Sequence, residues 1–268
     1  MGAALFQPGR WTPVNPVSPL SVGCRYCWLL NDGTNDDVYD VIQGRQATRE
    51  ANAAWVTAAG HGGYLMDMGG NSIDGGMDIA FGGVIGTEEF PDEFTIAVFG
   101  RMNIVESPNN IYDQSVTDIL LQNNGSFFRF DAGGALHSAS SHGINAGDWF
   151  HVVATASRVT GAVKLWQSAR FEPPVLGINQ SDAAWSAVSG SAHLGGRDTD
   201  GVFPVEASLG VFYFSNRMWT LDDVRLFIVD PYHAFRHTWD ARFKPPAAGG
   251  GGLSIPVAMH SYARRRAG

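Results

Sequence analysis

Apolar runs of strand length, separated by glycine and asparagine turns, constrain this chain more than any other feature. The turn at 123–125, Asn-Asn-Gly, joins the run 118–122 to the run 126–130. Asn-Gly between two apolar runs is a strong short-range signal for a β-hairpin. Four further runs have the same character: 94–99, 149–155, 162–166 and 209–214. A Val-Thr-Gly turn joins the run 149–155 to the run 162–166. Many short strands between such turns are typical of a β-sandwich or jelly roll.

Glycine accounts for 33 of the 268 residues and charged residues for only 16%, whereas about 7% glycine and about 25% charge are usual. This composition favours short strands over long helices. One helix is predicted, because Thr220 is a good N-cap and Asp222 and Asp223 suit the helix dipole in the first turn. The predicted fold class is therefore all-β: a jelly-roll sandwich with one short C-terminal helix and extended terminal arms.

Three regions differ in composition. Residues 1–23 contain recurrent prolines and are predicted to form an extended N-terminal arm, residues 24–244 the jelly-roll domain, and residues 245–268 a Pro/Gly-rich linker and basic C-terminal arm. Apolar residues on an extended arm suggest that it packs on something, either its own domain or a neighbouring subunit. The residues predicted to bind a partner are Phe6, Trp11, Ile255, Met259, Tyr262, Arg264, Arg265 and Arg266.

Several segments, taken in order, resemble the laminin-G-like family of concanavalin-A-like jelly rolls. They are Cys27–Gly33, Gly62–Gly69, Met77–Ile79, Phe94–Phe99, Gly147–Ala154, His193–Gly196, Leu209–Phe214, Asn216–Arg217 and Thr220–Val224. The resemblance covers roughly residues 24–230 and departs from the family at 167–169, Gln-Ser-Ala, where an Asn-Gly turn is usual. The segment Asp230–Phe235, followed by a proline-rich linker and an arginine-rich end, is similar to laminin-G-like proteins of tailed bacteriophages.

Charge and hydropathy limit the partners. The formal net charge is −8, which disfavours a nucleic-acid groove, since affinity for phosphate backbones comes mainly from clustered Lys and Arg. No run approaches the ~18 apolar residues that a membrane span needs, and the N-terminus lacks the pattern of a signal peptide. We therefore expect no nucleic acid and no membrane. The missing signal peptide fits what the phage resemblance implies, a virion protein assembled in the cytoplasm of a bacterial host.

Motifs for catalysis are missing from the sequence. The resemblance implies that an enzyme of this fold would carry Glu-x-Asp-x-x-Glu on one strand, and none of the seven glutamates stands in that pattern. Signatures of serine hydrolases, phosphate-binding loops and zinc proteases are also missing. A catalytic triad is defined by geometry rather than spacing, so an enzyme remains the third alternative, and the prediction is a protein without catalytic activity.

Calcium is the one cofactor that the sequence suggests, because it prefers six to eight oxygen ligands from Asp, Asn and backbone carbonyls. One cluster of acidic and amide residues falls on a turn at 31–37, a second at 67–78 is interspersed with glycines, and Asp198 and Asp200 lie in a third glycine-containing segment. The resemblance implies calcium in such loops. The alternative is that these residues simply form turns, since Asn and Asp tolerate left-handed geometry. The candidate metal ligands are Asp32, Asp36, Asp67, Asp74 and Asp78.

Carbohydrate binding is the other function that the resemblance implies, through exposed aromatic rings. Trp55, Trp185 and Tyr112 fall in loop-like stretches, and we name Trp55 and Trp185 as candidate glycan-binding residues. Trp28, Trp149 and Trp166 fall on predicted strands and are expected in the core.

The sequence leads to two functional hypotheses. The first is a structural protein of a phage virion, which decorates the particle surface or belongs to the tail. It would form a homo-oligomer in the particle and be anchored to capsid or tail subunits by its arms. The alternative is a glycan-binding adhesin that recognises host surface carbohydrate.

Overall fold

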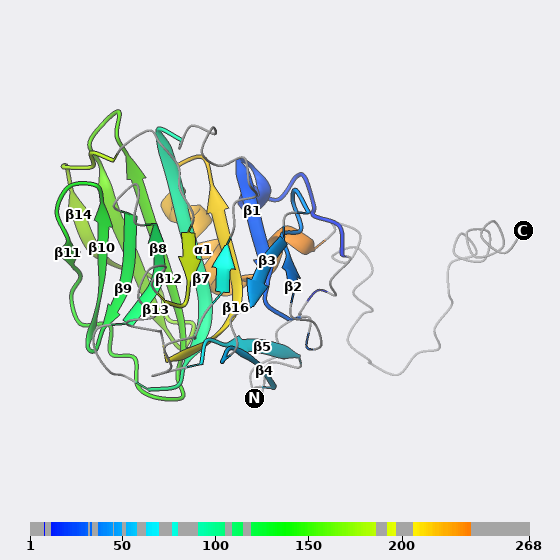
Figure 1. The fold of residues 1–268 in the computed structure, drawn as a ribbon. Coiled ribbons are helices and arrows are strands. Elements are labelled where there is room, and N and C mark those ends of the chain that lie inside the picture. Colours follow the sequence, from blue (N-terminus) through cyan, green and yellow to red (C-terminus); the bar gives the residue numbers. More distant parts are fainter. Residues whose placement is uncertain are drawn as a thin grey trace, which may run out of the picture. The chain divides into compact units, whose positions relative to one another are not determined.

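The computed structural model describes residues 8, 12–31, 33, 37–44, 46–49, 52–57, 63–69, 77–79, 91–104, 109–114, 119–185, 192–196 and 206–236, with the backbone alone at 37, 77–79 and 109. Contacts group residues 1–236 as one unit and 237–268 as another, and the second unit lies outside the described residues. The described part of the first unit is a sandwich of two antiparallel sheets (Figure 1). The all-β jelly-roll class predicted from the sequence is confirmed.

The first sheet, called sheet A, carries the long central strands. Its order is β14 (Val175–Gln180), β13 (Val163–Ala169), β12 (Trp149–Ser157), β7 (Glu93–Met102), β16 (Ala207–Ser215), β5 (Tyr64–Asp67) and β4 (Ala54–Thr57). The strand β1 (Cys24–Leu29) also pairs with β16. The hairpin predicted from the Val-Thr-Gly turn is β12–β13, with Ala156 opposite Val163.

The second sheet, called sheet B, packs across the core from sheet A. Its order is β11 (His137–Ser138), β10 (Phe127–Ala132), β9 (Ile119–Asn124), β8 (Asn109–Gln114), β15 (Ala192–Leu194), β6 (Met77–Ile79), β3 (Gln46–Arg49) and β2 (Asp37–Tyr39). The Asn-Gly hairpin is confirmed as β9–β10, where Asn124 pairs with Phe127 and Gly125 adopts φ of 69°.

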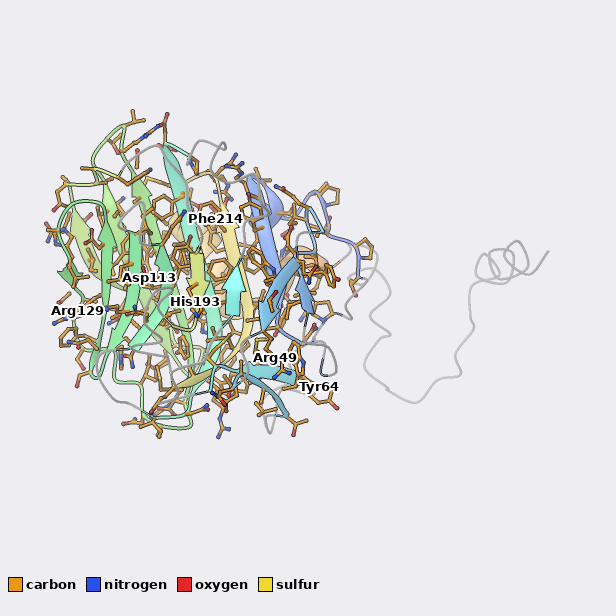
Figure 2. The ribbon with its side chains drawn as sticks, in the orientation of Figure 1. Arg49, Tyr64, Asp113, Arg129, His193 and Phe214 are labelled. Carbon is orange, nitrogen blue, oxygen red and sulfur yellow. The ribbon has the colours of Figure 1, made fainter. Side chains whose placement is uncertain are left out.

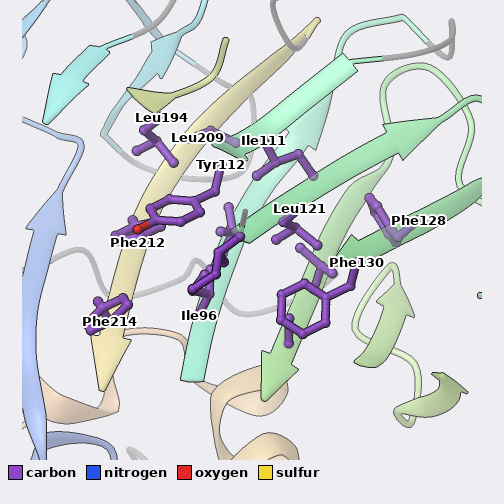
Figure 3. Close-up of a cluster of buried hydrophobic side chains, with 14 of the residues drawn as sticks. Ile96, Ile111, Tyr112, Leu121, Phe128, Phe130, Leu194, Leu209, Phe212 and Phe214 are labelled. Carbon is purple, nitrogen blue, oxygen red and sulfur yellow. The ribbon is translucent and has the colours of Figure 1, made fainter. Parts of the chain in front are cut away.

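The main core lies between the inner faces of the two sheets (Figure 3). Tyr112 of sheet B stacks on Phe212 of sheet A, with ring centroids 5.6 Å apart. Phe94 and Phe214, on neighbouring strands of sheet A, stack nearly in parallel at 5.9 Å. Burial of such side chains contributes about 1.5–3 kcal/mol each, so the Tyr112–Phe212 contact helps to hold the two sheets together, and the Phe94–Phe214 contact stabilises sheet A itself.

A second core covers the outer face of sheet A. Alternate residues of its strands point outward, and they pack against the α-helix α1 (Leu221–Val229) and the 3-10 helices η1 (Pro19–Ser21) and η3 (His233–Phe235). The predicted start of the helix is confirmed: Thr220 and Asp223 form a capping box, which satisfies backbone N–H groups of the first turn. No helix of the described residues is long and apolar enough to span a membrane.

The described part of the predicted N-terminal arm packs on its own domain. Leu20 is fully buried in the second core, and the Arg217 side chain donates to the carbonyl oxygens of Val22 at 2.9 Å and Pro19 at 2.7 Å. Residues 12–23 therefore belong to the sandwich and do not extend from it. Phe6 and Trp11, like all the candidate arm residues of the C-terminus, lie outside the described residues.

Candidate functional site

Two aromatic side chains share one face of the β4–β5 ribbon. Trp55 pairs with Met66 and Thr57 pairs with Tyr64. Because side chains alternate along a strand, and paired residues point the same way, Trp55 and Tyr64 lie diagonally adjacent on one face. Trp55 is half-buried against the main core, whereas Tyr64, nearer the end of the ribbon, is 41% exposed.

The ring of Tyr64 is held by a glycine. Gly33 adopts φ of 77°, and a Cβ at this position would lie 2.5 Å from Cδ2 of Tyr64. The backbone of residue 33 can therefore rest against the ring only because it has no side chain. This contact fixes the tyrosine ring before any ligand arrives, which lowers the entropy that binding would cost.

A guanidinium group reaches the same end of the sandwich from sheet B. Arg49 is the last residue of β3, and its Nη1 donates to the carbonyl oxygen of Ala53, two residues before Trp55. Figure 2 shows Arg49 and Tyr64 at this end of the domain. We call Arg49, Trp55 and Tyr64 the rim cluster.

Sequence reasoning selected Trp55 but missed Arg49 and Tyr64. If residues 54–57 and 64–67 are interpreted as paired strands whose side chains alternate between two faces, Tyr64 is predicted to lie beside Trp55. Arg49 carries no comparable local signal, because its approach to this ribbon depends on how the two sheets pack.

The second predicted glycan residue, Trp185, lies in the core. Its side chain is 5% exposed, its Nε1 donates to the carbonyl oxygen of Pro91 at 3.2 Å, and its ring meets Phe94 edge-on at 4.9 Å. Tyr112 is likewise fully buried, with its hydroxyl donating to Oε1 of Gln114 at 2.8 Å. Neither ring offers an open face to a sugar, so the expectation for both residues is corrected.

The predicted calcium ligands are only partly described. Asp67, at the end of β5, accepts from the Gly69 N–H at 3.1 Å and from Nδ2 of Asn103 at 3.2 Å. Asp78 belongs to the other sheet, where its backbone pairs with His193 and Thr48. Asp32, Asp36 and Asp74 lie outside the described residues. Within the described ranges, no group of three His, Cys, Asp or Glu is placed to hold a metal ion.

A second polar group lies on sheet B, on the face turned away from the main core. The Gln122 side chain donates to Oδ1 of Asn110 at 2.6 Å, and Nδ2 of Asn110 donates to Oδ2 of Asp113 at 3.2 Å. His193 pairs with Asp113 across the strands. All four side chains are buried, so the rim cluster is the more accessible of the two arrangements.

No family model and no curated protein matches the chain, but solved structures share its fold. Botulinum neurotoxin type C, whose cell entry depends on interaction with two ganglioside molecules, superposes with a TM-score of 0.58 at 13% identity, over 82% of this chain and 53% of that one. The binding domain of botulinum neurotoxin DC in complex with rat synaptotagmin II gives 0.60 at 13%, over the same shares.

A third structure with this fold is an enzyme. Trypanosoma rangeli sialidase in complex with sialic acid gives a TM-score of 0.53 at 14% identity, over 82% of this chain and 36% of that one. The chain thus spans about half the length of the neurotoxin structures and about a third of the sialidase. Identities this low show the fold alone: the chain is a jelly-roll sandwich of the kind that these proteins contain.

Proposed function

We propose that the protein is a carbohydrate-binding module without catalytic activity, and that its rim cluster contacts the sugar. The observation that carries this proposal is the exposed Tyr64 ring, held against Gly33 and adjacent to Trp55. Binding sites for small molecules combine aromatic surface with a few placed polar groups. Arg49 supplies the polar group.

The chemistry of the three side chains suits a glycan. The C–H face of a sugar ring packs on an aromatic face, and tyrosine adds a hydroxyl that donates and accepts hydrogen bonds. A guanidinium carries five N–H donors and pairs with hydroxyl or carboxylate oxygens. Solved structures of this fold support this class of ligand: botulinum neurotoxin type C interacts with two ganglioside molecules, the binding domain of botulinum neurotoxin DC is found in complex with SialylT, and the sialidase is in complex with sialic acid.

The virion role stays a prediction. Its candidate arm residues lie outside the described residues, and residues 12–23 pack on their own domain. Display on a particle would be compatible with glycan binding, because many weak contacts add up when modules are presented together.

A glycan array followed by calorimetric titration tests the proposal. We expect Tyr64→Ala to weaken binding of the selected glycan at least tenfold, with an unchanged melting temperature. Tyr39→Ala is the matched control, since Tyr39 is a similarly exposed tyrosine on β2 of sheet B, and it should bind as the unmodified protein does. Absence of binding to every glycan, or equal affinity of the two variants, would reject the rim cluster.

A further inference from the structure

His151 lies on the outer face of sheet A inside an enclosure of aromatic rings. It is fully buried on β12. The ring of Phe99, on β7, stacks on its imidazole with centroids 4.9 Å apart. The rings of Phe171 and of Phe227, the latter on α1, meet the imidazole edge-on at 5.0 Å and 5.6 Å. We call these four side chains the His151 enclosure.

Among the described residues, neither Nδ1 nor Nε2 of the His151 imidazole has a hydrogen-bond partner. A buried polar group without a partner costs about 1–3 kcal/mol, and a buried charge costs far more. Burial alone lowers the pKa of His151 to about 3. The enclosure therefore holds a neutral imidazole and is unsuited to an imidazolium.

Phe171, the outermost ring of the enclosure, sits on a strained turn. Arg170 and Phe171, between β13 and β14, have φ of 52° and 65°, a region that ordinary side chains avoid at a cost of order 1–3 kcal/mol each. Phe171 is 37% exposed, so it separates His151 from solvent. A side chain in this position is able to move without unpacking either sheet.

A few polar contacts keep the turn closed. The Arg170 N–H donates to the carbonyl oxygen of Trp149 at 2.9 Å, and its guanidinium pairs with Asp148 at 2.7 Å. The Ser168 hydroxyl donates to the carbonyl oxygen of Glu172 at 2.6 Å. Arg170 is exposed, and exposed ion pairs contribute little, so the Arg170–Asp148 pair adds little to the stability of the closed turn.

Most charged groups on the elements around His151 are paired with other residues. Arg101 of β7 donates from Nε to the Gly147 carbonyl oxygen, Asp148 pairs with Arg170, and Glu172 follows the strained turn. On α1, Asp222 pairs with Arg225 and Asp223 with Arg217. Lys164 lies further along β13, four residues before Ser168.

Two tyrosines also lie close to the enclosure: Tyr213 contacts the ring of Phe227, and Tyr232 contacts the ring of Phe99. The enclosure thus contains no counter-charge for a protonated His151.

We propose that Phe171 is a lid that opens when His151 takes up a proton. An imidazolium needs water or an anion, and the shortest route to water is displacement of the strained turn that carries Phe171. The opened lid uncovers the aromatic surface of Phe99. Below about pH 6.5, the usual range for histidine, the ratio of open to closed lid should rise about tenfold per pH unit, until the closed form also binds the proton near pH 3.

Amide hydrogen exchange of the full chain, corrected for intrinsic rates, tests the lid. The reporters are the N–H groups of Arg170 and Glu172, whose acceptors are the carbonyl oxygens of Trp149 and Ala169. We expect their protection to fall about tenfold between pH 6 and pH 5, while peptides of β7 stay protected. Constant protection of the turn, or an equal loss in β7, would overturn the proposal, since the second result means global unfolding.

Two variants separate the lid from general acid sensitivity. His151→Phe should abolish the pH dependence at the turn, whereas His137→Gln, at a surface histidine that pairs with Asp182, should keep it. If His151→Phe does not fold, Phe171→Ala serves instead: the midpoint of the NMR titration of His151 should rise toward about 6.5, because the ring then reaches water without the cost of opening the lid. A titration midpoint for His151 that does not change in Phe171→Ala would show that Phe171 is not the lid.

Discussion

The backbone N–H of Asn15 donates to the carbonyl oxygen of Ala234 at 2.6 Å, which joins the beginning of the described domain to its end. The Asn15 side chain adds a bond from Nδ2 to the carbonyl oxygen of Arg236, also at 2.6 Å. Ser18 and His233 contact through Oγ and Nδ1 at 2.8 Å. Residues 15–18 and η3 thus lie against each other, and both segments pack on the second core.

Leu20 should be the main energetic anchor of the N-terminal segment. It is fully buried in the second core, and truncation of a buried leucine costs about 2–5 kcal/mol. Leu20→Ala should lower the free energy of unfolding by this amount in urea denaturation. Val17→Ala is the control, because Val17 is 69% exposed and should change stability by less than about 0.5 kcal/mol. Equal effects of the two substitutions would contradict the packing of this segment.

Gly33 should matter for ligand binding as well as for stability. Gly33→Ala puts a methyl group into the Tyr64 ring, whereas Gly44→Ala meets nothing within 4 Å although both glycines have positive φ. Both variants should lose about 1 kcal/mol or more from backbone strain. Only Gly33→Ala should also displace Tyr64 and weaken the glycan binding proposed for the rim cluster. Titration of both variants against the selected glycan measures the difference, and the prediction fails if their affinities match.

The environment of His142 predicts that the domain loses free energy of unfolding as the pH falls. Its Nδ1 accepts from the Ile144 N–H at 3.0 Å and its Nε2 contacts Oδ1 of Asn123 at 3.2 Å, so the folded domain requires the neutral ring. Burial lowers the pKa of His142 to about 4. Between about pH 6.5 and 4 the unfolded chain therefore binds a proton that the folded chain does not, and stability falls as the pH falls.

The size of this effect can be measured by urea denaturation at pH 7 and pH 5. Each histidine buried in this way should remove about 1–2 kcal/mol over that interval, and His151 adds to His142 with the same sign. His142→Gln should show a smaller loss between the two pH values than the unmodified protein, even if it is less stable at pH 7. A loss of the same size would assign the acid sensitivity to other groups.

Local signals made the hairpins and the helix predictable. The β9–β10 hairpin follows from Asn-Gly between apolar runs, and α1 follows from Thr220 with its acidic first turn, because both structures depend on residues near in sequence. Trp185 was misplaced for the opposite reason. It follows the last residue of β14 by five positions, and its burial comes from Phe94 and Pro91, which lie far away in the sequence.

The candidate site was less predictable than the fold. Tyr112 looked like a loop residue, since an irregularity between Asn110 and Tyr112 breaks the alternation of β8. The rim cluster joins Arg49 of sheet B to two residues of sheet A, so it exists only once the sheets have packed. Strand patterns set the face on which a side chain lies, but not the partner that the opposite sheet brings to it.

The capping box offers a last test, of the junction between sheet A and its helix. The Thr220 hydroxyl accepts from the Asp223 N–H at 3.3 Å, and the Asp223 carboxylate accepts from the Thr220 N–H at 2.8 Å and from Arg217 Nη1 at 2.8 Å. Thr220→Ala removes one acceptor and should cost about 1 kcal/mol in urea denaturation. Thr220→Ser keeps the hydroxyl and should cost much less. If serine and alanine destabilise the domain equally, the methyl group of Thr220 and not its cap holds the start of α1, and the orientation of Phe227 toward His151 would then rest on packing alone.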